Sequence, residues 1–116
     1  MIEIGIDIQE INQFLERNKK MVEKIFSFRE VEYCESKHAP AQHYAVRFAA
    51  KEAVIKALSG FGEKLNYGDI EILIKDKKPY IKVNKALRKK YKYSVSLSHS
   101  GDYAIANVIV QNGCTK

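Results

Sequence analysis

The chain has 116 residues, which fits one domain, so we treat residues 1–116 as a single domain. Its composition, 46% hydrophobic and 29% charged, is that of an ordinary globular protein and excludes a disordered chain. The formal net charge of +6 favours partners with negative charge, such as nucleic acid, an acidic protein or a phosphorylated small molecule.

The chain carries no apolar run as long as a membrane span, and its N-terminus lacks a basic segment followed by an apolar one. We therefore expect a cytoplasmic protein that makes no membrane contact. Cys34 and Cys114 lie far apart without metal-ligand spacing and are expected to be free thiols. The lysines are spread along the chain, which argues against a nucleic-acid-binding tail.

Residues 2–9 alternate isoleucine with other residues, which predicts a strand whose buried face is the isoleucine face. Asp7 is then on the other face, where Gly5 leaves room for a ligand or another element to approach. From this pattern alone, a solvated carboxylate is the simpler interpretation of Asp7.

Two helices are predicted next. Residues 12–24 carry helical spacing of apolar side chains. Ser27 and Glu30 have the spacing of a capping box, which predicts a short helix through Cys34. That helix is expected to end before Pro40, because the residue preceding a proline is biased away from helix.

The long helix predicted after Pro40 ends at Ser59, with Gly60 as its left-handed cap. It has apolar residues on two sides, so we expect burial on both. Its charges are Arg47, Lys51, Glu52 and Lys56. Glu52 and Lys56 form a favourable i, i+4 pair, whereas Arg47 and Lys51 repel unless an anion lies between them. A solvated basic edge explains the pattern more simply.

The remaining residues predict two antiparallel hairpins separated by a helix. A strand at 70–75, a turn at 76–79 and a strand at 80–83 precede a short basic helix at 85–91, which Asn84 caps. The second hairpin pairs 94–99 with 103–110. His99 ends its first strand beside the turn, where a ligand-binding role and a hydrogen-bonded sheet histidine are equally plausible.

Three motifs, in this order, carry a resemblance to a known family: Gly-Ile-Asp-Ile at 5–8, RFAAKEAVIKAL at 47–58 and SLSHSGDYAIA at 96–106. Together they resemble holo-acyl-carrier-protein synthase, the short trimeric type of 4′-phosphopantetheinyl transferase. The resemblance implies the α+β fold of that family, a small antiparallel sheet packed around a long central helix. It also implies a homotrimer with active sites at the subunit interfaces.

The implied activity is a magnesium-dependent transfer of 4′-phosphopantetheine from coenzyme A to a serine of apo-acyl carrier protein. This reaction supports fatty acid biosynthesis and releases adenosine 3′,5′-bisphosphate. By the family's motifs, Asp7 and Glu52 are the metal ligands, and Glu52, Lys56 and Asp7 are the catalytic residues. Such a site suits Mg²⁺, which takes one or two carboxylates, several waters and substrate phosphates. The residues expected to bind coenzyme A are Arg47, Lys51, Lys56, Ser98 and His99.

One position departs from the family. Where it commonly has an arginine that contacts acidic residues of the carrier protein, this chain has Gln13, and Arg17 or the pair Lys19-Lys20 is predicted to replace that contact. The acceptor of the serine proton stays open between a metal-bound water and Glu52 acting through water. Outside this family, a nucleic-acid-binding domain, a scaffold domain and a metal-dependent hydrolase remain alternatives.

Overall fold

A long central helix, α3 (Pro40–Ser59), organises the fold, and a computed structural model describes residues 1–112. The other elements are β1 (Ile2–Glu10), the 3-10 helix η1 (Ile11–Phe14), α1 (Lys19–Ile25), α2 (Phe28–Glu35), η2 (Tyr67–Asp69), β2 (Glu71–Lys75), β3 (Lys78–Lys82), α4 (Lys85–Lys90), β4 (Tyr91–Ser100) and β5 (Tyr103–Asn112).

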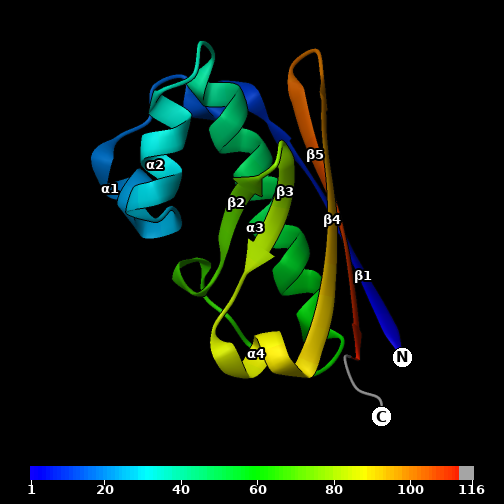
Figure 1. Cartoon of the computed structure of the whole chain (residues 1–116). Helices are drawn as coiled ribbons and strands as arrows, with labels where there is room; N and C mark the ends of the chain where they lie inside the picture. The colour runs from blue at the N-terminus through cyan, green and yellow to red at the C-terminus, as the bar shows by residue number, and fades with distance from the viewer. Residues whose placement is uncertain (113–116) are drawn as a thin grey trace.

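Two antiparallel sheets surround this helix. The larger sheet has the strand order β1-β5-β4, and the smaller one pairs β2 with β3. Figure 1 shows the larger sheet along one side of α3, with α1 and α2 on the other and the β2-β3 hairpin beside the helix. This arrangement confirms the predicted α+β architecture. Twelve of the twenty residues of α3 are buried, which confirms that the helix is enclosed on more than one side.

Strand β1 lies directly against α3 because Gly5 has no side chain. A Cβ atom added at Gly5 would overlap the carbonyl oxygen of Ala53 and lie 2.8 Å from the carbonyl carbon of Ala53 and 3.1 Å from the nitrogen of Ala57. The small residues of α3 complete this contact from the other side. The close approach brings the neighbouring Asp7 to the surface of the helix.

The predicted orientation of β1 is wrong for the single chain. Ile2, Ile4, Ile6 and Ile8 are 56–65% exposed, and on the opposite side Gly5 is buried and its neighbours on that face are half-buried. The alternation correctly predicts a strand with two different faces, but it does not say which face meets the chain's own helix. The need for a glycine against Ala53 decides that question.

The helical predictions before α3 are partly confirmed. Ser27 and Glu30 form the predicted capping box at the start of α2. The single helix predicted for residues 12–24 is instead divided into η1 and α1. Asn18 separates them and begins α1 as its N-cap, because its side chain accepts a hydrogen bond from the backbone N–H of Met21.

Two predicted turns differ from the structure. Gly60 has a φ of −63°, so it is not a left-handed cap, and positive φ occurs at Gly62 (83°). The β2-β3 turn is shorter than predicted, because Asp76 and Lys77 both have positive φ and Lys78 already belongs to β3. A two-residue turn of this kind matches the twist of the strands that it joins.

The structure bears on the expected absence of a membrane span and on the expected state of the two cysteines. No helix within residues 1–112 is long and apolar enough to cross a membrane. Cys34 is a free, buried thiol, and burial raises its pKa to about 12, so it is unreactive. Cys114 lies outside the described residues.

Candidate active site

Asp7 is held by two side chains at the contact between β1 and α3. The ammonium of Lys56 lies 2.9 Å from Oδ1 of Asp7 and donates to the carbonyl oxygen of Ile6 at 3.0 Å. Gln9 donates to Oδ2 of Asp7 at 2.6 Å. Gln9 reaches Asp7 because residues two apart on a strand share a face. Asp7 therefore has a fixed orientation and a cation beside it.

Glu52 lies one helical turn before Lys56 and is held by Tyr67 of η2. The Tyr67 hydroxyl donates to Oε2 of Glu52 at 2.7 Å, and within residues 1–112 Oε1 of Glu52 accepts no hydrogen bond. The hydrogen bond to Glu52, burial and the negative charges of Glu52 and Asp7 together raise the pKa of Tyr67 to about 12. Both carboxylates thus act on one hydroxyl. We call Asp7, Glu52, Lys56 and Tyr67 the carboxylate cluster.

A pocket of about 320 Å³ lies beside two members of the carboxylate cluster, Asp7 and Lys56, and the rest of its lining is Ile6, Ile8 and Ile105. The donor set suits a magnesium ion, which needs only one or two carboxylates and completes its coordination with water and substrate phosphates. It does not suit a zinc ion, which takes three or four side-chain ligands, because residues 1–112 hold no ligating group of three or more His, Cys, Asp or Glu residues. Asp7 and Glu52 are the residues that could hold a metal.

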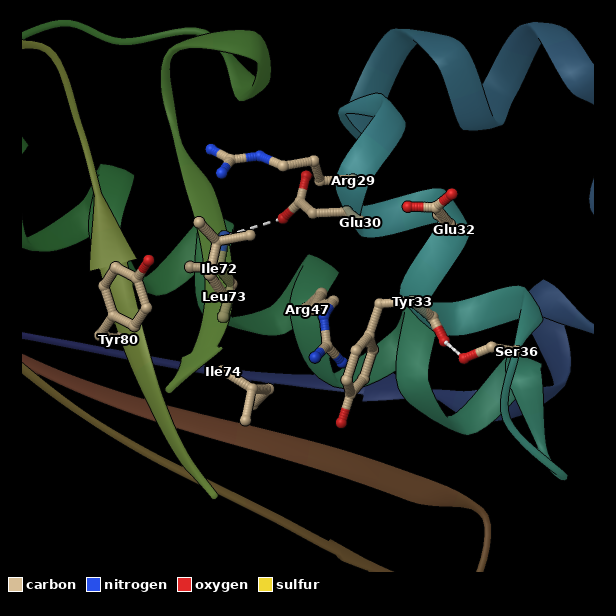
Figure 2. A pocket seen from close by; sticks show the side chains of 10 residues that line it. All are labelled: Arg29, Glu30, Glu32, Tyr33, Ser36, Arg47, Ile72, Leu73, Ile74 and Tyr80. Atoms are coloured by element: carbon tan, nitrogen blue, oxygen red, sulfur yellow. Dashed lines mark hydrogen bonds between the residues drawn. The ribbon is translucent and has the colours of Figure 1, made fainter. Parts of the chain in front are cut away.

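Arg47 lies elsewhere, in a pocket of about 430 Å³ between α2 and the β2-β3 hairpin. Figure 2 shows its guanidinium beside the ring of Tyr33, and the distance from Cζ to the ring centroid is 4.2 Å. One terminal nitrogen donates to the carbonyl oxygen of His43 at 3.2 Å. Arg47 is only 2% exposed, yet its Nε has no partner among the described residues. A buried guanidinium with a spare donor is suited to an anion.

Lys51 does not reach either pocket, which corrects its predicted contact with a substrate phosphate. Its ammonium is fully buried 2.7 Å from Oε1 of Glu30 and donates to the carbonyl oxygens of Ile25 and Tyr67. Burial lowers the pKa of Lys51, while Glu30 opposes that shift. With all three donor positions taken inside the protein, Lys51 is a core residue.

His99 lies at the end of β4, next to the β4-β5 turn. Its Nε2 is 3.1 Å from Nε2 of Gln42 on α3. A pocket of about 180 Å³ at this point is lined by Gln42, His43, Val46, Leu97, Ser98 and His99. The predicted Ser98 and His99 therefore lie at a common pocket, which the side chains of α3 complete.

The structure brings some of the predicted residues together and separates others. Asp7, Glu52 and Lys56 form one group. Arg47 and Glu52 are five residues apart, which places them about 140° from each other around α3. Arg47 and His99 also line two other pockets, and neither of them lines the pocket beside Asp7.

Three contacts were not predicted. The contact between Gln9 and Asp7 could have been predicted from the sequence, because residues two apart on a strand share a face. The contacts of Tyr67 with Glu52 and of Gln42 with His99 join segments distant in sequence, and no spacing rule indicates them. Arg17, which was predicted to contact the carrier protein, forms a bidentate ion pair with Glu35, with N–O distances of 2.9 and 3.0 Å. Its guanidinium is thus already engaged.

Comparison with known proteins identifies the family. The sequence profile described as the 4′-phosphopantetheinyl transferase superfamily matches residues 3–108. The chain belongs to this superfamily.

Relatives of this 4′-phosphopantetheinyl transferase support the assignment over nearly its whole length. The holo-[acyl-carrier-protein] synthase of Geobacter metallireducens is 40% identical, covering 92% of this chain and 94% of the relative. The solved complex of the Helicobacter pylori holo-[acyl-carrier-protein] synthase with coenzyme A has a TM-score of 0.80 and 35% identity, covering 93% of this chain and 99% of that one. The Chronobacterium ammoniagenes synthase-coenzyme A complex has a TM-score of 0.82 at 26% identity, covering 98% and 99%.

Proposed function

We propose that this protein is a magnesium-dependent holo-[acyl-carrier-protein] synthase that transfers 4′-phosphopantetheine from coenzyme A to a serine of apo-acyl carrier protein. The observation that carries the proposal is the carboxylate cluster, in a chain that is 40% identical over 92% of its length to a holo-[acyl-carrier-protein] synthase. Adenosine 3′,5′-bisphosphate is the second product. Fatty acid biosynthesis is the process served.

In this reaction the serine oxygen forms a bond to the phosphorus that carries pantetheine, and the bond from that phosphorus to the bridging oxygen of adenosine bisphosphate breaks. Asp7 and Glu52 would hold Mg²⁺, which neutralises charge on phosphate oxygens when bound. Lys56 lies within 3 Å of Asp7, so its ammonium is placed to neutralise a neighbouring phosphate oxygen. The protein's own contribution is mainly positioning and charge stabilisation.

The proposed assembly is a homotrimer with active sites between subunits. Its support is the outer sheet face, which we define as Ile4, Ile6, Ile8, Ile105 and Ile109. These five residues are 38–65% exposed in the single chain, and the register places Ile4 opposite Ile109 and Ile8 opposite Ile105. A contiguous apolar face of this kind marks a protein interface. A neighbouring copy would then supply the Arg47 and His99 side of the coenzyme A site to the carboxylate cluster.

A cytoplasmic location belongs to the same proposal. The free, buried Cys34 is consistent with a reducing compartment. The net charge of +6 suits a phosphorylated donor and an acidic protein acceptor.

Product analysis tests the proposed reaction. The protein is incubated with coenzyme A and magnesium, with and without apo-acyl carrier protein, and products are separated by chromatography. We expect adenosine 3′,5′-bisphosphate to appear only when carrier is present, in amounts equal to the carrier consumed. Free phosphopantetheine formed without carrier would instead indicate a hydrolase. Equal turnover with and without a chelator would contradict the metal dependence.

The matched variant for this assay is Glu52→Gln. It keeps the size of the side chain and an oxygen that can accept from Tyr67, but it removes the negative charge. We expect transfer to fall by a factor of about 100 or more, as when a charge-stabilising group is removed from an active site. Transfer retained at saturating magnesium would exclude Glu52 as a metal ligand.

A further inference from the structure

Resting on the proposed function, the geometry points to a role for Tyr67: we propose that it is a positioning residue whose hydroxyl fixes Glu52 so that Oε1 is presented to the magnesium ion. The Tyr67 hydroxyl takes Oε2 at 2.7 Å. Oε1 then remains the carboxylate oxygen without a hydrogen bond among the described residues. Tyr67 does not touch the reacting atoms in this account.

Glu52 is half-buried, so burial alone does not select one rotamer of its long side chain. An unrestrained glutamate loses side-chain conformational entropy when it is fixed by a ligand. A hydrogen bond that already holds the carboxylate removes part of that cost before the metal arrives. Groups that orient metal-binding carboxylates in this way typically change metal affinity by a factor of 10–100 when they are removed.

Tyr67 can orient Glu52 only if it is itself fixed, and three contacts fix it. Its ring packs edge-on against Phe48 of α3, with the centroids 5.4 Å apart. Its carbonyl oxygen accepts a hydrogen bond from the buried ammonium of Lys51 at 3.2 Å. The η2 turn that carries it is closed by Asp69, whose side chain accepts a hydrogen bond from the backbone N–H of Asn66 at 2.8 Å and whose own N–H donates to the carbonyl oxygen of Asn66 at 3.0 Å.

Lys51 gains a role from this arrangement. Its ammonium is anchored on Glu30 of α2 at 2.7 Å and reaches the backbone of Tyr67 from inside the protein. A continuous set of contacts thus runs from the buried ion pair through Tyr67 to the carboxylate of Glu52. Lys51 supports the site from the core without meeting the substrate.

The variant Tyr67→Phe tests the proposal because it removes the hydroxyl and keeps the ring contact with Phe48. The matched control is Tyr93→Phe, which removes the hydroxyl that donates to the carbonyl oxygen of Leu87 in another part of the fold. Metal binding is measured directly, by electron paramagnetic resonance titration of the protein with Mn²⁺ in the presence of coenzyme A. The magnesium dependence of transfer is measured in parallel.

We expect Tyr67→Phe to weaken Mn²⁺ binding about tenfold. The magnesium concentration for half-maximal transfer should rise in proportion, the KM for carrier protein should stay unchanged, and kcat at saturating magnesium should fall much less. Tyr93→Phe should change none of these values.

Two results would overturn the inference, and they are distinguishable from each other. Unchanged Mn²⁺ binding in Tyr67→Phe, with unaltered magnesium dependence, would reduce Tyr67 to a packing residue and leave the proposed function intact. Absence of Mn²⁺ binding in the unaltered protein would overturn both the inference and the proposed metal site.

Discussion

Gly5→Ala should separate β1 from α3 and thereby disturb the candidate site. The added methyl carbon would overlap the carbonyl oxygen of Ala53 and lie 2.8 Å from its carbon, and both atoms belong to the backbone of a buried helix. Carbon atoms in ordinary contact are about 3.5–4 Å apart, so the strand must retreat by about 1 Å. Overpacking costs about 1–3 kcal/mol where side chains can adjust. Because the backbone of a buried helix cannot adjust as side chains do, we expect Gly5→Ala to lower the free energy of unfolding by about 3 kcal/mol.

Urea denaturation followed by circular dichroism measures this loss, and Gly68→Ala is the matched control. A Cβ at Gly68 would have open space around it, so this substitution should change stability by less than about 1 kcal/mol. Gly5→Ala should also lose transfer activity, because Asp7 moves with the strand. A Gly5→Ala protein as stable as Gly68→Ala would show that β1 does not approach α3 as described.

Three further predictions concern stability and assembly. Lys51→Met leaves the carboxylate of Glu30 buried without its cation, so the free energy of unfolding should fall by about 3–5 kcal/mol. Adding Glu30→Gln to this variant should restore part of the lost stability. If urea denaturation shows no recovery in the double variant, the pairing of Lys51 with Glu30 is contradicted. The pKa of Glu71 is lowered by hydrogen bonds from Arg29 and Ser27, so the ionised carboxylate stabilises the fold above pH 4.5, and this stabilisation is lost as the pH falls through the lowered pKa. The free energy of unfolding of Glu71→Gln should therefore decrease less steeply below pH 4.5 than that of the unaltered protein. Parallel pH dependences of the two proteins would refute this. Ile6→Glu places a charge on the outer sheet face and should convert the proposed trimer to monomers in sedimentation experiments; an unchanged mass would contradict that interface.

Local patterns were sufficient for most of the fold. The capping box at Ser27, the helix starting at Pro40 and the period of two in the strands all depend on residues close in sequence, and the structure confirms them. The extent of the 76–77 turn was less certain from sequence, because positive φ at Asp76 and Lys77 is unusual for residues other than glycine.

Patterns were insufficient where two explanations share the same spacing. The isoleucines of β1 have the alternation of a core face, but that core is not formed within one chain. Lys51 has the charge and position of a phosphate ligand, yet Glu30, twenty-one residues earlier, takes its ammonium. In both cases the deciding contact is distant in sequence, Ala53 for Gly5 and Glu30 for Lys51, and no local rule contains it.

The candidate site was predictable only in part from the sequence. The motif residues Asp7, Glu52 and Lys56 were identified by resemblance, and the structure brings their elements together. Tyr67 lies in a loop without periodicity, so only the structure shows that its hydroxyl meets Glu52.

Intact mass spectrometry of the carrier protein measures the phosphopantetheine transfer directly. An apo-acyl carrier protein is incubated with this protein, coenzyme A and magnesium, beside an identical sample that contains a chelator. We expect the carrier to gain the mass of one phosphopantetheine group, and the gain to be absent with chelator. No gain with any of several carriers would contradict the proposed function while leaving the fold and family in place.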